Sequence, residues 1–567
     1  MSQAPTPQRD KPSAPLPEPA GGSAPPPAAG PVPARTAGWA ATAAAWIPPA
    51  AAAAVMLVLG WWGIARGNSM GNDEVATRWA ALLPLRELAH LLGNVDAVHG
   101  LYYLLMHGWV ALGSSPVILR IPSVIAMAVA AVLMVIIGRR LTGSGWAGLF
   151  AGLIMALTPS ISFYAQTARS YAMVFACVLG STLALMHAME AEAAGRASRR
   201  RWLVYAGLVA LGGYLNEMSL LVLAAHAVTV LLARYGRPAV ERWLWAAGGG
   251  AALVAPLVLL SIKEHAALGW VSPPDLTDLR VLAQDYFGAE TVAAGLLAIC
   301  AVVALLPPAG TWRWLPAGAG QAGAEQARAG QAGAKQPGAE PGPPWWRSGG
   351  VSLPSVAAPL LVLPAAILMI ESILLRPLYV DRYVLYGEAG AALLAGAGLY
   401  RIGRWAGDAS GRRALVWLPG VLVCLCVLVL QLAPQYHVRR PGSRRYDYGG
   451  PSRYVGTNAW PGDGILFFGK FYRKAKLGYP GDFRNTSDFA QAASPLQVGN
   501  FQGRDKPVGV TLPLMLGYRR IWVYGARPSL RRPEAELRAE SAVLLRRYIL
   551  IRQRQFHGIL VTLWQRR

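Results

Sequence analysis

Charged side chains are scarce in this sequence, acidic ones more so than basic ones. They account for 14% of the 567 residues, whereas 54% of the residues are hydrophobic. A chain of this length with so few charges cannot form a water-soluble surface, which excludes an ordinary soluble protein and predicts a polytopic membrane protein. The chain has 53 Lys and Arg but only 29 Asp and Glu, so its formal net charge is +24. Most basic residues lie in short clusters between apolar runs, where they orient membrane helices, so we expect no nucleic-acid partner.

Cysteine is also rare, with four residues in the whole chain. All four fall inside apolar runs, at Cys177, Cys300, Cys424 and Cys426. Isolated cysteines in such runs are inert packing residues, so neither a disulfide framework nor a cysteine metal site is expected.

The first 42 residues contain almost no large apolar side chains and are rich in Pro, Ala and Gly. Such a segment cannot bury enough surface to fold, which predicts a disordered cytoplasmic tail over 1–42. The tail places the first apolar run too far from the start for an ordinary cleaved signal peptide. Residues 43–66 are therefore interpreted as a retained signal anchor.

Long apolar runs divide residues 43–433 into about eleven predicted membrane spans, since roughly 20 apolar residues cross the hydrocarbon layer. The short runs 202–215 and 218–233 form either two spans with a tight turn or one long bent helix. Counting them as two leaves most short basic clusters on one side, which predicts a cytoplasmic N-terminus and an outer C-terminus in the plasma membrane. The predicted spans are 43–66, 117–138, 143–158, 170–190, 202–215, 218–233, 243–262, 289–307, 353–375, 384–400 and 414–433.

Three segments outside the spans have a character of their own. The first outer loop, 67–116, contains two stretches of helical periodicity, at 76–92 and 95–112, which predict helices at the membrane interface. Residues 308–352 are rich in Ala, Gly and Gln and predict a low-complexity cytoplasmic loop. Residues 434–567 are polar and predict a small extracytoplasmic α/β domain. Its expected strands are 464–469, 520–525 and 556–564, and its expected helix is 534–547. The predicted fold class is thus mainly α.

Two adjacent carboxylates, Asp73 and Glu74, follow the first span, where a charged pair has no obvious packing role. Ionisable groups beside a membrane are costly unless they have a partner or a function. A carboxylate can take the proton from an acceptor hydroxyl, and nearby cations can hold a departing lipid phosphate. Further ionisable residues predicted on the same face are His99, Arg120, Arg169, Lys263, Asp285, Arg376, Asp381 and Arg382.

Each of these features also has a structural explanation. Asp73 and Glu74 are suited to the start of a helix, where a cap and a first-turn acid are stabilising. Arg120, near the start of the second predicted span, can snorkel toward the headgroups. The basic cluster 437–445 is expected to meet anionic lipid.

The motifs resemble the protein-O-mannosyltransferase-like group, family 39, of the GT-C superfamily. The resemblance rests on Asp73-Glu74, on His-Gly-Leu-Tyr-Tyr from His99 to Tyr103, on the 166–171 motif QTARSY, and on Asp381-Arg382-Tyr383. Many relatives read His-Pro-Pro-Leu-Tyr-Tyr, whereas this chain has only Gly100 after the histidine. The 270–274 motif WVSPP, preceded by Lys263, is similar to a segment of bacterial mannosyltransferases.

The resemblance implies a polytopic GT-C-like fold and an inverting transfer from a polyprenyl-phosphate sugar at the outer face. Asp73 would be the catalytic base, and Glu74 would either position the acceptor or support a divalent metal ion; no other cofactor is implied. The residues expected to bind substrate are His99, Tyr103, Arg120, Gln166, Arg169, Tyr171, Lys263 and Arg382.

The sequence therefore predicts a membrane glycosyltransferase that moves a hexose, mannose by resemblance, to a cell-envelope glycan, glycolipid or protein. The alternative is a transporter or lipid flippase, which would show paired repeats and charges near the bilayer midplane. The sequence shows no such duplication.

Overall fold

A computed structural model describes residues 35–66, 69–196, 198–263, 271–306, 350–412, 415–444, 446–532 and 534–567. Most of the predicted tail 1–42 and nearly all of the predicted loop 308–352 lie outside these residues, as do Trp270 and the residues just before it. Residues 1–46 form a unit separate from residues 47–567.

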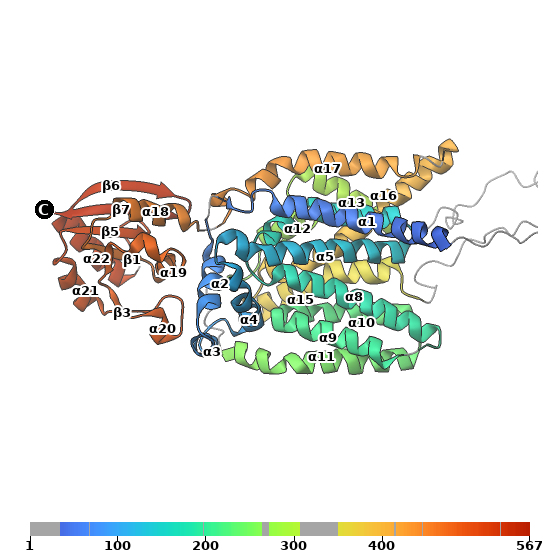
Figure 1. Cartoon of the computed structure of the whole chain (residues 1–567), viewed down its shortest axis with the longest axis horizontal. Helices are drawn as coiled ribbons and strands as arrows, with labels where there is room; N and C mark the ends of the chain where they lie inside the picture. The colour runs from blue at the N-terminus through green and yellow to red at the C-terminus, as the bar shows by residue number, and fades with distance from the viewer. Residues whose placement is uncertain are drawn as a thin grey trace, which may run out of the picture. The chain divides into compact units, whose positions relative to one another are not determined.

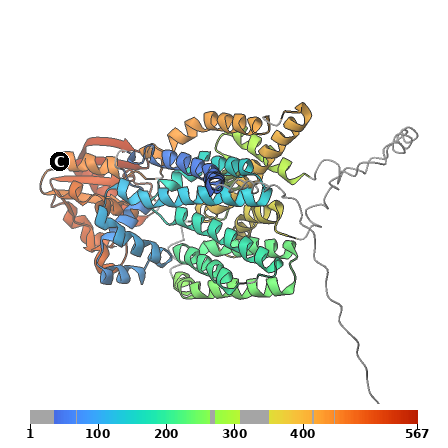
Figure 2. The same cartoon turned by 45° about the vertical axis from the view of Figure 1, so that its right-hand side comes forward.

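The membrane region is made of helices, and a helix covers each predicted span. Helices α5, α8, α9 and α11 run side by side in both views (Figures 1 and 2). The bounds are α1 Arg35–Trp61, α5 Pro116–Thr142, α6 Gly145–Leu157, α7 Pro159–Ala165, α8 Tyr171–Ala193, α9 Arg199–Leu215, α10 Val222–Ala233, α11 Arg237–Lys263, α12 Leu276–Phe287, α13 Thr291–Leu305, α15 Leu353–Leu374, α16 Glu388–Ser410 and α17 Leu418–His437.

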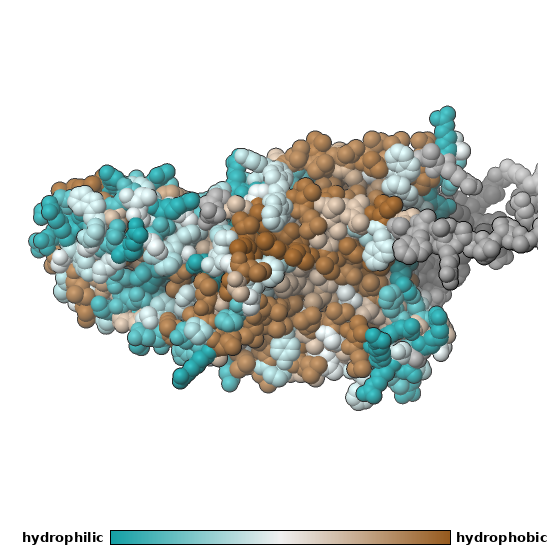
Figure 3. Space-filling model, in the orientation of Figure 1, coloured by the Kyte–Doolittle hydropathy of each residue, from teal (hydrophilic) through white to brown (hydrophobic). Residues whose placement is uncertain are grey.

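The surface of these helices is apolar. Figure 3 shows hydrophobic residues over much of the visible face of the bundle, and large side chains such as Val58, Trp245 and Leu259 are exposed. Such a surface is suited to lipid. Six described helices are long and apolar enough to cross a membrane, or up to eight if each bent pair counts as one span. The count of eleven spans and the orientation of the termini stay predictions.

The chain reverses direction between α9 and α10. The side chain of Asn216 accepts a hydrogen bond from the backbone N–H of Met218 (3.0 Å), which closes the turn. Tyr205 on α9 lies 3.1 Å from Nδ1 of His226 on α10, so residues equally far from the turn are neighbours. Of the two alternatives for 202–233, the structure has the tight turn between two antiparallel helices.

The first outer loop folds into three helices where the periodicity predicts two. They are α2 Asn72–Leu82, α3 Leu85–Leu92 and α4 Gly100–Trp109. The predicted helix 76–92 is divided at Pro84, because a residue before proline avoids the helical conformation and Leu83 is extended. The start of α2 lies four residues earlier than predicted. Consequently Asp73 and Glu74 both occupy its first turn, with Gly71 at the cap position.

The C-terminal region has the predicted α/β character. Its sheet has the order β2-β1-β5-β7-β6, with β1 parallel to both neighbours and β7 antiparallel to β5 and β6. Predicted strands 464–469 and 520–525 correspond to β1 Asp463–Phe468 and β5 Arg520–Gly525, and predicted helix 534–547 to α22 Ala535–Arg547. The remaining bounds are α18 Gly449–Asn458, α19 Lys474–Gly478, β2 Thr486–Asp488, β3 Gln491–Ala493, α20 Pro495–Val498, β4 Arg504–Asp505, α21 Val508–Met515, β6 Tyr548–Phe556 and β7 Ile559–Arg566.

The third predicted strand was wrong in its extent. Residues 556–564 contain the last residue of β6, a turn at Gly558 and most of β7. Strand β6 was not predicted, because exposed polar residues such as Arg552 and Gln553 interrupt the alternation of apolar and polar residues that is expected of a strand.

Residues that follow α17 contact the first outer loop. Tyr479 accepts a hydrogen bond from the backbone N–H of Met70 (2.7 Å), and Arg78 donates to the carbonyl of Gly478 (3.3 Å). Arg444 reaches the start of α2, where a Cβ on Gly71 would lie 2.6 Å from its Cδ. The absence of a side chain at Gly71 thus lets this arginine approach the predicted catalytic pair.

Candidate active site

Asp73 is the most accessible carboxylate of the predicted site. Its side chain is 34% exposed, and its Oδ1 lies 3.6 Å from Nη2 of Arg169. Burial alone would raise the pKa of Asp73, but the charges of Arg169 and then Arg382 hold it well below its usual range. Asp73 is therefore an ionised, solvent-accessible acid beside cations.

Arg169 is buried and rigidly held. Its Nη1 donates to the hydroxyl of Tyr103 (2.7 Å), and that hydroxyl donates to Oδ2 of Asp96 (2.7 Å). Nη2 of Arg169 also lies 3.5 Å from Asp96, and the guanidinium lies over the Tyr103 ring. One arginine therefore bridges two carboxylates, and Tyr103 fixes its direction.

Arg382 approaches from the loop between α15 and α16. Its Nε donates to the hydroxyl of Tyr171, the first residue of α8 (3.0 Å), and its guanidinium lies over the rings of Tyr171 and Tyr383. Residues from three distant parts of the chain are thereby assembled near Asp73.

His99 lies inside this assembly, with 6% of its surface exposed and its ring edge-on to Tyr171. Burial, reinforced by the charge of Arg169, lowers the pKa of His99 to about 3. The imidazole is therefore neutral at physiological pH, when it can both donate and accept a hydrogen bond. Its Nδ1 has no hydrogen-bond partner among the described residues. We call these residues the Asp73 cluster: Asp73, Asp96, His99, Tyr103, Arg169, Tyr171 and Arg382.

Glu74 belongs to a different environment. It is 1% exposed and forms a bidentate pair with Arg120, in which both oxygens lie 2.7 Å from guanidinium nitrogens. The backbone N–H groups of Gly71 and Ala168 also donate to it, at 3.2 Å each, and Arg444 lies 3.4 Å away. Burial would raise the pKa of Glu74, but Arg120 and Arg444 hold it well below its usual range. Both oxygens are occupied by protein groups.

Gln166 and Arg120 are as buried as Glu74. The amide of Gln166 donates to the carbonyls of Gly60 (2.9 Å) and Trp62 (2.7 Å), which fastens the end of α1 to the loop after α7. Arg120 does not snorkel outward, because its guanidinium is bonded to Glu74 and to the Ser69 carbonyl (2.6 Å). We call Glu74, Arg120, Gln166 and Arg444 the Glu74 cluster.

Within the basic cluster 437–445, Arg439 and Arg444 differ from the expectation of headgroup contact, whereas His437 and Arg440 are exposed. Arg439 is 7% exposed, donates to the carbonyls of Trp62 (2.8 Å) and Leu59 (2.6 Å), and lies over the Trp62 ring. Arg444 is bonded to the Gln166 carbonyl (3.0 Å). These two arginines bind protein groups because free carbonyls at the end of α1 and in the loop after α7 need donors.

Lys263 is separate from both clusters. It is the last residue of α11, is exposed, and borders the undescribed segment 264–270. Within the described parts of the chain, no contact joins Lys263 to the Asp73 cluster.

Three residues of the site were not predicted. Asp96 adopts a left-handed conformation (φ 60°) before the short helix η2 Ala97–His99, and it completes the pair with Arg169. Lys474 of α19 is buried, and its charge acts on Asp73 and Asp96. Arg444 completes the Glu74 cluster. Asp96 lies three residues before His99 and could have been included with the same motif, whereas the other two are near the site only through long-range folding.

No group of three or more His, Cys, Asp or Glu side chains in the described ranges is arranged to hold a metal ion. Glu74, the residue considered for metal support, has both oxygens bound by arginine and backbone. The described residues therefore do not fit a divalent ion at this position, and no step below involves one.

Residues 100–261 match the family model described as dolichyl-phosphate-mannose-protein mannosyltransferase. No curated protein sequence matches the chain. ArnT from Cupriavidus metallidurans has a similar structure in the apo state, with a TM-score of 0.53, and bound to undecaprenyl phosphate, with a TM-score of 0.54. Each comparison has 14% sequence identity and covers 94% of this chain and 98% of that one.

The match includes Gly100–Tyr103, which follow His99 in the first motif, and the whole QTARSY motif, and both motifs are among those that carried the resemblance in the sequence. The structural similarity extends over the helices and the C-terminal sheet together. The resemblance is thus confirmed to this extent: residues 100–261 match the protein mannosyltransferase family model, and the chain has a fold similar to that of ArnT.

Proposed function

We propose that this protein is an inverting glycosyltransferase that moves mannose from a polyprenyl phosphate to a cell-envelope acceptor at the outer face of the plasma membrane. The observation that carries the proposal is the environment of Asp73. Asp73 is an ionised carboxylate beside the cations Arg169 and Arg382, and it is more exposed than Asp96, the other carboxylate beside Arg169 (34% against 24%). These are the two elements that transfer from a lipid phosphate requires, a proton acceptor and a site for developing negative charge.

Asp73 acts as the general base. Its carboxylate takes the proton from the acceptor hydroxyl as that oxygen bonds to the anomeric carbon and the bond to the phosphate breaks. A carboxylate with a strongly lowered pKa is a weak base. An anionic phosphate bound at Arg169 and Arg382 would offset the charges that lower the pKa of Asp73, so donor binding itself increases its basicity.

Arg169 and Arg382 bind the phosphate. Both are already ordered, by Tyr103 and Tyr171 respectively, so little side-chain entropy is lost when the donor binds. The neutral imidazole of His99 faces the same cluster and has a free nitrogen among the described residues, which suits a hydrogen bond to a sugar hydroxyl. Tyr103 and Tyr171 orient the two arginines.

Glu74, Arg120 and Gln166 are positioning residues in this proposal. Glu74 shares the first turn of α2 with Asp73, and its bonds to Arg120 and to the Ala168 backbone fix that turn against α5 and the loop that carries Arg169. The proposal thus differs from the expectation that Glu74 touches the acceptor or a metal ion. Lys263 has no assigned role here.

The comparisons support the choice of donor. The matching family is described by dolichyl-phosphate mannose, and the similar ArnT structure contains undecaprenyl phosphate. Both are polyprenyl phosphates, which favours a transferase over a transporter or flippase.

The experiment is a transfer assay with the purified protein in liposomes, in which radiolabelled polyprenyl-phosphate mannose is compared with the glucose and arabinose donors. Envelope extract from cells that lack the protein serves as acceptor. Transfer of label from the mannose donor is the expected result. Preference for another sugar would change the donor, and no transfer from any polyprenyl phosphate would contradict the proposal.

A further inference from the structure

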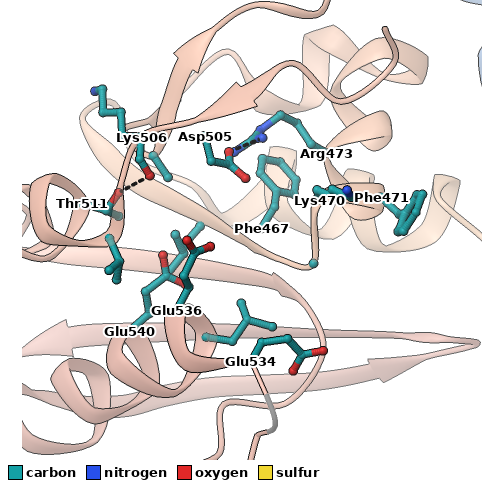
Figure 4. Close-up of a pocket in the computed structure, with 15 residues that line it drawn as sticks. Phe467, Lys470, Phe471, Arg473, Asp505, Lys506, Thr511, Glu534, Glu536 and Glu540 are labelled. Carbon is teal, nitrogen blue, oxygen red and sulfur yellow. Dashed lines mark hydrogen bonds and ion pairs between the residues drawn. The ribbon is translucent and has the colours of Figure 1, made fainter. Parts of the chain in front are cut away.

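A cavity of about 350 Å³ lies in the C-terminal domain, away from the Asp73 cluster. It opens beyond the end of β1, at Phe467 and Gly469, between the start of α22 and the segment around β4 (Figure 4). Ligands of α/β proteins bind outside the carboxyl ends of parallel strands, in cavities of about 300–1,000 Å³. Its position and size are those of a site for a small ligand.

The cavity contains a buried acid that no protein group binds. Glu540 of α22 is 8% exposed, and no described residue donates a hydrogen bond to its carboxylate. Figure 4 shows the carboxylates of Glu536, Glu540 and Asp505 turned toward the middle of the cavity. Burial, and then the charges of Asp505 and Glu536, raise the pKa of Glu540 to about 7. Solvent reaches the carboxylate oxygens of Glu540 through the cavity, so a ligand bound there can donate hydrogen bonds to them.

Two of the three cations of the cavity are already engaged, and the third, Lys470, is exposed and lies over the Phe471 ring. Arg473 is bound by Asp488 (2.9 Å) and Asp505 (2.5 Å), and Lys506 donates to the Phe489 carbonyl (2.8 Å). The lining holds three cations and four carboxylates in all, so its net charge is close to zero. A phosphate would find no free arginine and would meet Glu536 and Glu540. A neutral ligand rich in hydroxyl donors fits this set better than a strongly charged one.

The rest of the lining is apolar. Leu466, Phe467, Val508 and Leu537 contribute hydrocarbon to the cavity. A sugar ring presents hydroxyl groups at its edge and C–H groups on its faces. It can therefore donate hydrogen bonds to Glu536 and Glu540 while its C–H groups contact the apolar side chains.

From these observations we infer that the C-terminal domain binds a saccharide in this cavity, with Glu536 and Glu540 accepting hydrogen bonds from its hydroxyl groups. The connection to acceptor recognition rests on the proposed function: the saccharide would be part of the envelope acceptor, held apart from the site of transfer.

The test uses the full-length protein in lipid nanodiscs, without donor lipid, and saturation-transfer NMR. The probe is a mixture of di- to tetrasaccharides from mild hydrolysis of the envelope of the producing cell. Saccharide ring-proton signals are expected with the unaltered protein. Binding should be at least about tenfold weaker in Glu540→Gln and in Glu536→Ala, because each loses a charge-assisted hydrogen bond. Glu536 is exposed, so its replacement does not endanger folding.

Asp482→Asn is the matched control, since this carboxylate lies in the same domain outside the cavity, and it should bind as the unaltered protein does. Absence of saccharide signals, or equal signals in all four proteins, would overturn the inference. Binding of spermidine without saccharide would overturn it too and assign the cavity to amines. This binding test contains no donor, so its result does not depend on transfer. A protein that binds saccharide here but transfers no sugar in the liposome assay would contradict only the proposed function.

Discussion

At the scale of single residues, two neighbouring acids have opposite roles. Asp73 and Glu74 differ by one position in the first turn of a helix, so their side chains point roughly 100° apart. Asp73 faces an accessible region beside Arg169, whereas Glu74 enters a buried pair with Arg120. The difference in exposure, 34% against 1%, assigns chemistry to the first and positioning to the second.

Replacing Arg169 with lysine should reduce transfer by about 10- to 100-fold, even though the charge is kept. Lysine is a point charge and cannot contact Tyr103, Asp96 and Asp73 together as the planar guanidinium does. The rate of transfer at low donor concentration, which gives kcat/KM, measures the effect, and Arg546→Lys on the exposed face of α22 is the control. Equal rates for Arg169→Lys and the unaltered protein would show that Arg169 does not bind the phosphate.

Glu74→Gln should destabilise the protein by about 3–5 kcal/mol, because Arg120 and Arg444 would remain buried with their charges uncompensated. Asp73→Asn removes a half-exposed carboxylate and should change stability far less. Thermal unfolding of the two variants in the same detergent gives the comparison. Similar losses in both would contradict the division into two clusters.

The value of kcat/KM for transfer should change little as the pH is lowered from about 8 to about 5. The pKa of Asp73 is lowered, so the base stays ionised, and the pKa of His99, about 3, keeps the imidazole neutral throughout this range. The pH profile of kcat/KM at low donor concentration reports these groups in the free enzyme. An inflection near pH 6.5 that disappears in His99→Gln would mean that His99 titrates, contrary to this expectation.

The site residues predicted from sequence alone were those whose position carries a free-energy cost that can be recognised in the sequence. Charged side chains beside apolar spans, such as Asp73 and Arg169, are costly unless they have a partner or a function. The motif resemblance supported their assignment to the site. Lys474 and Arg444 lie in polar stretches where a basic residue is unremarkable. Their proximity to the site depends on how the C-terminal region contacts the outer loop, which periodicity and composition do not contain.

At the scale of elements, the apolar periods located each membrane helix because burial in lipid demands long apolar runs. The ends of helices were less predictable where a single residue determines where a helix stops or the chain turns. Pro84 divides the first interfacial helix, and Asn216 closes the turn between α9 and α10. Strand β6 has an apolar run at 548–551 followed by polar residues, so its sequence does not show the alternation expected of a strand.

Glu540→Gln on α22 should stabilise the C-terminal domain at pH 8 and have little effect at pH 5. The folded-state pKa is about 7, above that of an unfolded glutamate, so ionising the buried acid costs stability as the pH rises through that value. The difference between a pKa of about 7 and the usual value of 4.5 corresponds to about 3 kcal/mol at pH 8. The thermal midpoint at the two pH values is the measurement, and destabilisation at pH 8 would show that the carboxylate has a cationic partner.

At the scale of the molecule, segments far apart in the chain converge on one short turn. The first outer loop supplies the acids, the loops before α8 and α16 supply the arginines, and the region after α17 supplies Arg444 and Lys474. The fold therefore brings the charged residues of several connections to one end of the helices. The order of spans and loops in the sequence is compatible with this convergence, but it does not predict which loops meet in space.

The account depends most directly on Asp73 as the base. The decisive measurement is single-turnover transfer from labelled polyprenyl-phosphate mannose by Asp73→Asn, with donor affinity determined in parallel. The account predicts a fall of at least about 100-fold in the rate of the chemical step, with donor affinity retained or increased because a negative charge near the phosphate is removed. A rate within about twofold of the unaltered protein would contradict it.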